Sequence, residues 1–174
     1  RYAIENPDMF SYRMLSRLGT LERDYPGSIV IIFLENLWKS IIMPFWKNGN
    51  IWVHSIPDRP ALDTVTAVLF LSGVILVIYR YIKTHDWRDL FLLISIPLLM
   101  LPSILSLAFP EENPSLNRSA GAMIPIFVLA GIGLTSLWKN LSAGTKHGPL
   151  KFARAGIVIT LILWSTVSNF NLVF

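Results

Sequence analysis

The chain has 174 residues, of which 53% are hydrophobic and only 15% are charged, and its mean hydropathy is +0.53. Soluble domains carry about 25% charged residues, so this composition excludes an ordinary soluble domain and favours a membrane protein. The net charge of +4 does not predict nucleic-acid binding, because the basic residues are scattered between apolar blocks and form no basic stripe. Cysteine is absent, which excludes disulfides, thiolate metal sites and cysteine nucleophiles.

Residues 1–63 precede the long apolar blocks and are expected to form an extracytoplasmic linker. Within them, residues 28–46 show helical periodicity, because polar side chains such as Glu35 and Lys39 share one helix face and apolar side chains occupy the other. This pattern predicts an amphipathic helix that lies in the outer membrane interface. A fifth transmembrane helix whose polar stripe faces a cavity is the alternative.

Four later segments are apolar over about 20 residues, the length at which a helix crosses roughly 30 Å of hydrocarbon. The predicted spans are residues 64–82, 90–110, 119–138 and 155–174. Asp58 is the expected N-cap of the first span, and Pro97 and Pro102 predict a kink in the second. The predicted fold class is therefore all-α, a multi-pass transmembrane helix bundle over residues 64–174 with the interfacial helix outside it.

Basic residues are concentrated in two of the loops between the predicted spans, residues 80–89 and residues 139–154. The positive-inside rule places such loops in the cytoplasm. Residues 47–63, residues 109–118 and the end at Phe174 then face the outside. The predicted localisation is therefore that of a multi-pass protein of the cell membrane, with polar outer loops available for function.

The sequence contains no Walker loop, dinucleotide glycine fingerprint, HExxH or GxSxG signature. Its candidate chemistry lies in two polar stretches predicted on the outer side, residues 48–63 and residues 111–125. In the second stretch, Arg118 stands at the start of a predicted span, where helix amides and the macrodipole favour an anion such as a lipid phosphate. The alternative is an interfacial anchor that reaches ordinary phospholipid.

Other polar side chains of these stretches each have a structural alternative. Glu111 and Glu112 could act as general acid or base or bind a divalent cation, or they could be solvated loop carboxylates. Asp58 and Arg59 could contact a substrate, or they could hold a tight turn beside the membrane. His54 has no second His or Cys at ligand spacing, so no metal site is predicted around it.

A set of short motifs carries a family resemblance. The motifs are Asn6-Pro-Asp-Met-Phe-Ser-Tyr-Arg13, Pro26-Gly-Ser28, Phe33-Leu-Glu-Asn-Leu-Trp38, Trp52-Val-His-Ser-Ile-Pro-Asp-Arg-Pro-Ala-Leu-Asp63 and Glu112-Asn-Pro-Ser-Leu-Asn-Arg-Ser-Ala-Gly121. Their order resembles the C-terminal half of prokaryotic glycosyltransferase family 39 proteins, which are relatives of the dolichyl-phosphate-mannose protein mannosyltransferases with the GT-C membrane fold. The resemblance extends over most of the chain.

The resemblance implies a membrane glycosyltransferase that moves a hexosyl or pentosyl group from a polyprenyl-phosphate carrier to an acceptor on the outer face. It places the catalytic acidic residue in an external loop upstream of Arg1, so no catalytic residue is assigned here and residues 1–174 alone are expected to be inactive. Arg118 matches the arginine-containing stretch that would hold the carrier phosphate. The predicted substrate-binding residues are Arg118, Asn117, Glu112, Arg59, Asp58 and His54.

The expected partners are the lipid bilayer, the polyprenyl-phosphate sugar donor and an acceptor of unknown identity, with a divalent cation left open as a cofactor. Two other functions are alternatives. A membrane transporter would need charges or broken helices near the bilayer midplane, where only the prolines of the second span suggest a break. A non-catalytic membrane assembly subunit would have the same hydropathy as this chain.

Overall fold

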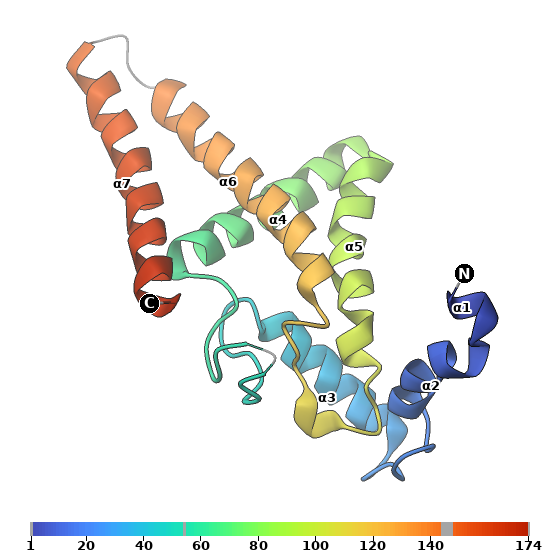
Figure 1. The fold of residues 1–174 in the computed structure, drawn as a ribbon. Helices are drawn as coiled ribbons and strands as arrows, with labels where there is room; N and C mark the ends of the chain where they lie inside the picture. The colour runs from blue at the N-terminus through green and yellow to red at the C-terminus, as the bar shows by residue number, and fades with distance from the viewer. Residues whose placement is uncertain (1, 54, 144–147, 174) are drawn as a thin grey trace. The chain divides into compact units, whose positions relative to one another are not determined.

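The computed structural model describes residues 2–53, 55–143 and 148–173, and these residues form helices and connecting turns without any strand (Figure 1). The helices are α1 (Tyr2–Glu5), α2 (Pro7–Leu18), α3 (Ile29–Ile42), α4 (Thr64–Thr84), α5 (Trp87–Ile104), α6 (Met123–Ala143) and α7 (Gly148–Val173), with 3-10 turns η1 (Pro110–Glu112) and η2 (Ala120–Ala122). The all-α prediction is therefore confirmed.

Three helical segments are long and apolar enough to cross a membrane, namely Thr64–Thr84, Trp87–Ile104 and Ala120–Leu141. These three support the predicted helical membrane bundle. In α7 the apolar stretch among the described residues, Ala155–Asn171, is shorter, so the fourth span stays a prediction. Residues 144–147 of the predicted loop 139–154, and the end at Phe174, lie outside the described residues.

The second span begins and ends earlier than predicted, because α5 begins at Trp87 and ends at Ile104, whereas residues 90–110 were expected. Side-chain amides explain the early end of the helix. The amide of Asn36 donates to the carbonyl oxygen of Ile104 at 3.1 Å, and the amide of Asn113 donates to that of Ser106 at 3.3 Å. The first bond satisfies a carbonyl group that has no intrahelical partner at the C-terminus of α5, and the second satisfies a carbonyl group in the turn that follows.

The first span, α4, is capped by Asp63, so the expectation that Asp58 would be the cap is wrong. The Asp63 carboxylate accepts hydrogen bonds from the backbone N–H groups of Val65 at 3.1 Å and Thr66 at 3.2 Å, as an N-cap does. Asp58 instead adopts a positive φ of 57° in the preceding loop. Helix α4 continues to Thr84, which reduces the predicted cytoplasmic loop 80–89 to a short turn before α5.

Helix α3 has 14 residues and spans about 21 Å at 1.5 Å per residue, which is shorter than the hydrocarbon core of a bilayer. A fifth transmembrane helix is therefore not supported. Its buried positions are Ile32, Asn36 and Ser40. Its exposed large apolar residues are Ile29, Val30, Ile31, Leu34, Trp38 and Ile41. An outward apolar face suits the predicted interfacial helix.

The chain divides into two compact units, described here separately. Unit 1 consists of Arg1–Ala61 and Pro97–Gly121, and unit 2 consists of Leu62–Ile96 and Ala122–Phe174. Unit 1 thus contains residues 1–61 of the predicted linker 1–63, together with the end of α5 and the segment that follows it. One backbone hydrogen bond within unit 1 joins the Ala108 N–H to the Arg17 carbonyl oxygen at 3.3 Å.

In unit 2, helices α4 and α6 cross with their backbones in contact (Figure 1). A Cβ atom added at Gly73 would lie 2.0 Å from the carbonyl oxygen of Leu129, and one added at Gly133 would lie 2.2 Å from that of Leu69. Only glycine permits such close approach, and small residues of this kind are typical of packed membrane helices.

Candidate functional site

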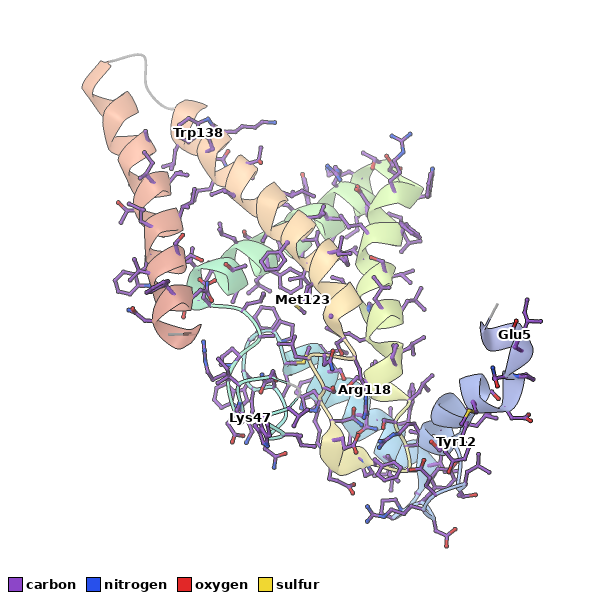
Figure 2. The ribbon with its side chains drawn as sticks, in the orientation of Figure 1. Glu5, Tyr12, Lys47, Arg118, Met123 and Trp138 are labelled. Atoms are coloured by element: carbon purple, nitrogen blue, oxygen red, sulfur yellow. The ribbon has the colours of Figure 1, made fainter. Side chains whose placement is uncertain are left out.

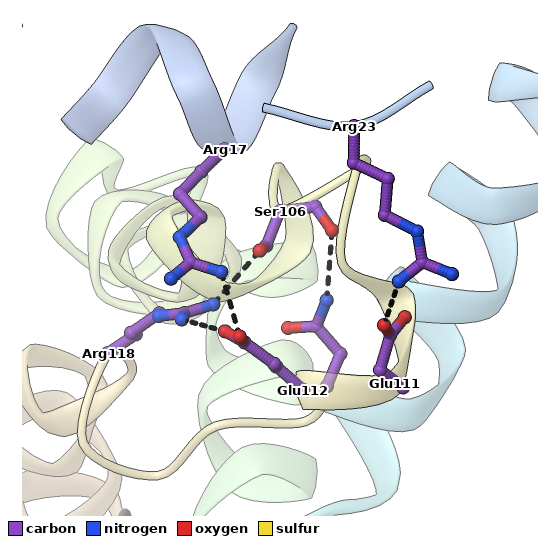
Figure 3. A network of polar contacts seen from close by, with 7 residues as sticks. Arg17, Arg23, Ser106, Glu111, Glu112 and Arg118 are labelled. Atoms are coloured by element: carbon purple, nitrogen blue, oxygen red, sulfur yellow. Dashed lines mark hydrogen bonds and ion pairs between the residues drawn. The ribbon is translucent and has the colours of Figure 1, made fainter. Parts of the chain in front are cut away.

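Arg118 lies in the segment between α5 and α6. This segment leads to the start of α6 at Met123 (Figure 2). Its guanidinium Nη1 donates to the Ser106 hydroxyl at 2.9 Å, and its Nη2 pairs with Glu112 (Figure 3). Arg17, on α2, donates to the other carboxylate oxygen of Glu112 at 2.8 Å. A single carboxylate therefore bridges two guanidinium groups from distant parts of the sequence.

Further contacts hold Arg17 and the loop that carries Glu112 in place. The Arg17 guanidinium lies over the ring of Phe109, 4.2 Å from its centroid, in a cation–π contact. The loop that carries Glu112 is tied to α5 through Asn113, because the Ser103 hydroxyl donates to the Asn113 amide oxygen at 2.7 Å. The Ser103 hydroxyl also accepts from the Ser115 backbone N–H at 2.9 Å.

Glu112 is ionised at neutral pH in this arrangement. Burial raises its pKa, but the hydrogen bonds donated by Arg118 and Arg17 outweigh that effect and leave the pKa below its ordinary value. The carboxylate neutralises one of the two positive charges that face it. The cluster of Arg17, Glu112 and Arg118 therefore retains one net positive charge.

A cleft of about 880 Å³ opens beside this cluster within unit 1. Arg17 and Arg118 contribute its basic lining, and its apolar lining comes from Leu18, Leu101, Pro102 and Leu105. Three of these apolar residues belong to or directly follow α5, a helix of membrane-spanning length. Tyr12, Ser16 and the exposed Glu22 complete the lining. Cationic and apolar groups thus share one cleft, which is what an amphiphilic anion requires.

The predicted site residues of the first polar stretch do not reach this cleft. Asp58 pairs with Lys47 (Figure 2) across 2.6 Å, with both side chains exposed, and Arg59 accepts the Asn48 backbone N–H at 2.7 Å through its carbonyl oxygen. These contacts fit the structural alternative, in which the pair shapes a turn. His54 lies outside the described residues.

The two polar stretches nevertheless meet within unit 1. A Cβ added at Gly49 would lie 2.5 Å from the Pro114 carbonyl oxygen, so the two loop backbones touch. Asn117 is exposed, and its side chain does not line the cleft. Of the five predicted substrate-binding residues that the structure describes, Arg118 and Glu112 belong to the cluster, and only Arg118 lines the cleft.

Glu111 and Glu112 are not arranged as ligands of a divalent cation. Both oxygens of Glu112 are bonded to guanidinium groups, and Glu111 pairs with Arg23 (Figure 3). Among residues 2–53, 55–143 and 148–173, no three His, Cys, Asp or Glu side chains gather where they could hold a metal ion.

Arg17 was not among the predicted site residues, because it lies in the segment expected to be an extracytoplasmic linker. It lies 95 positions from Glu112, so no local spacing connects them. The pairing of Arg17 with Glu112, like that of Arg23 with Glu111, is visible only in the structure.

Comparisons with protein-family models, with curated proteins and with solved structures find no match for this chain. Any functional proposal therefore rests on the geometry of the cleft and on the sequence motifs.

Proposed function

We propose that the chain is part of a membrane glycosyltransferase that transfers a sugar from a polyprenyl-phosphate carrier to an acceptor at the outer face of the membrane. The observation that carries this proposal is the cleft in which Arg17 and Arg118 lie beside apolar side chains of α5. A polyprenyl phosphate has the complementary design, with an anionic phosphate at the membrane surface and a long apolar chain.

The arginine cluster also suits the chemistry of the transfer. When the bond between the sugar and the carrier breaks, negative charge increases on the leaving phosphate. Guanidinium groups that are already oriented stabilise such charge without reorganising at the moment of reaction. Glu112 and Ser106 hold Arg118 in that orientation. Glu22, exposed in the same cleft, is available to accept hydrogen bonds from sugar hydroxyls.

No residue described here is proposed as the catalytic acid or base. Glu112 forms ion pairs with two arginines, and Asp58 forms one with Lys47 away from the cleft. The family resemblance assigns this role to an external loop of the full-length protein, and that assignment stays a prediction.

Turnover of the full-length protein with a polyprenyl-phosphate sugar tests the proposal. Arg118→Ala removes charge-assisted hydrogen bonds worth about 1.5–3 kcal/mol each, so kcat/KM for the donor should fall by roughly 10- to 100-fold. Arg23→Ala is the matched control, because Arg23 pairs with Glu111 and does not line the cleft. Equal kinetic constants for the Arg118→Ala and unsubstituted proteins would sink the proposal.

The outer-face assignment has its own test, for which the cysteine-free sequence is a ready background. Asn50→Cys and Arg88→Cys introduce single thiols at exposed positions, one in the predicted outer loop 47–63 and one at the start of α5, in the segment predicted to be cytoplasmic. A membrane-impermeant maleimide should label position 50 in intact cells and position 88 only after permeabilisation. The reverse pattern would invert the predicted topology.

A further inference from the structure

Unit 2 contains a second cleft, of about 720 Å³, between α4 and α6. The two helices touch at Gly73 and Gly133 and separate beyond this crossing (Figure 1). On α4 the cleft is lined by Leu76, Arg80 and Lys83, which recur every three or four positions and so form one helix face. This face changes from apolar to basic towards the C-terminal end of α4.

The opposing face of α6 has the same design. Val128 and Ile132 line the apolar part, and Lys139 lines the cleft near the C-terminal end of α6, next to Trp138 (Figure 2). Ser136 adds a hydroxyl group between them. On each helix the lining thus begins with apolar side chains, continues through polar or charged ones and ends at a lysine. Both lysines lie towards the end that the positive-inside rule places in the cytoplasm.

The charges of this cleft are not balanced. Arg80 pairs with the buried Asp89 through two of its nitrogens and is neutralised. Lys83 lies 5.6 Å from the centroid of the Tyr79 ring, and within the described part of the chain neither Lys83 nor Lys139 has an ion pair.

Asp86 also places a negative charge near Arg80. It accepts the backbone N–H of Arg88 at 2.9 Å and does not line the cleft. Two positive charges therefore remain over an apolar groove between membrane helices.

We propose that this cleft binds an anionic phospholipid of the surrounding bilayer, with the headgroup in the part of the cleft whose charge comes from Lys83 and Lys139 and the acyl chains along Leu76, Val128 and Ile132. Basic pockets between transmembrane helices on the cytoplasmic side suit such headgroups. The proposal depends neither on the glycosyltransferase function nor on the Arg118 cleft.

Native mass spectrometry of the purified chain, titrated with phosphatidylglycerol or phosphatidylcholine, tests this site. The unsubstituted chain should bind phosphatidylglycerol more tightly than phosphatidylcholine. Each of Lys83→Gln and Lys139→Gln should weaken phosphatidylglycerol binding by roughly fivefold, as expected for one lysine at a membrane surface. Arg88→Gln is the matched control, because it removes the same charge from the same end of unit 2 outside the cleft.

Four results would overturn the proposal. Equal affinity for the two phospholipids would show no headgroup selection, and an equal loss in Arg88→Gln would show only general surface attraction. Competition by glycerol phosphate as strong as that by the lipid would identify a free phosphate as the ligand. Tighter binding of polyprenyl phosphate, lost in the same lysine variants, would make the cleft a carrier site. Circular dichroism confirms that each variant retains its helices.

Discussion

The two units are stabilised by different kinds of contact. Nine of the ten buried polar or charged residues in the described chain belong to unit 1, whereas unit 2 contributes only Asp89. Unit 2 is built around the close contact of α4 with α6 at Gly73 and Gly133. Hydrogen bonds of side chains therefore organise unit 1, and close packing of helices organises unit 2.

The difference follows from how each unit satisfies its backbone. Long helices bond their own N–H and C=O groups, so their side chains can be apolar and their backbones can approach closely. The loops of unit 1 have no such internal pairing, and buried backbone groups need partners. Asn36, Asn48 and Asn113 supply them by donating to carbonyl oxygens. Unit 1 should therefore be sensitive to lost polar groups, and unit 2 to added volume.

The largest expected effect is at the contact between α4 and α6. Gly133→Ala places a methyl group 2.2 Å from the Leu69 carbonyl oxygen and 2.5 Å from the Ser72 hydroxyl, so a helix must move. Overpacking of this kind should lower the free energy of unfolding by about 3 kcal/mol, measured by denaturation in mixed micelles.

Gly131→Ala is the control for this contact, because a Cβ there meets nothing within 4 Å. Its free energy of unfolding should change by no more than about 0.5 kcal/mol, apart from a gain in helix propensity. Equal effects of the two substitutions would refute close packing as the basis of unit 2.

Loss of a buried amide should have the next largest effect, in unit 1. Asn113→Ala removes the partner of the Ser103 hydroxyl and of the Ser106 carbonyl oxygen and leaves both buried. The free energy of unfolding should fall by about 2 kcal/mol in the same assay. Asn117→Ala, at an exposed position four residues later, should change it little. If Asn113→Ala leaves the free energy of unfolding unchanged, unit 1 does not depend on its buried polar groups.

A smaller effect should depend on pH. The hydrogen bonds from Arg118 and Arg17 hold the pKa of Glu112 below its ordinary value of 4.5 despite burial. A lowered carboxyl pKa contributes stability that is complete above pH 4.5 and is lost as the pH falls through the folded-state value. Glu112→Gln should therefore lower the free energy of unfolding by about 1 kcal/mol at neutral pH. The difference in this free energy between the variant and the unsubstituted protein should shrink in acid.

Glu111→Gln provides the comparison for Glu112. Glu111 pairs with Arg23 at an exposed position, and exposed pairs contribute only about 0.2–1 kcal/mol. A larger or equally pH-dependent effect at Glu111 would contradict the distinct role given to Glu112.

The membrane helices were predictable because their signal is local. Apolar runs of spanning length identified α4, α5 and α6. Helix α4 begins at the predicted residue, with Asp63 as its cap, whereas α5 ends earlier than predicted, where Asn36 bonds the Ile104 carbonyl oxygen. Arg118 and Glu112 were predicted as site residues because they lie in a polar stretch beside a predicted span. Arg17 was not, since its contact with Glu112 depends on tertiary packing over 95 positions.

The most direct test of the central claim is the affinity of the chain for polyprenyl phosphate in phosphatidylcholine nanodiscs. We predict binding that requires the phosphate, so that the free polyprenol binds much more weakly. Arg118→Ala should weaken it by roughly tenfold or more, while Arg23→Ala leaves it unchanged. Equal affinity of the unsubstituted chain for polyprenol and polyprenyl phosphate would contradict the account. Equal affinity of Arg118→Ala and Arg23→Ala for polyprenyl phosphate would contradict it as well.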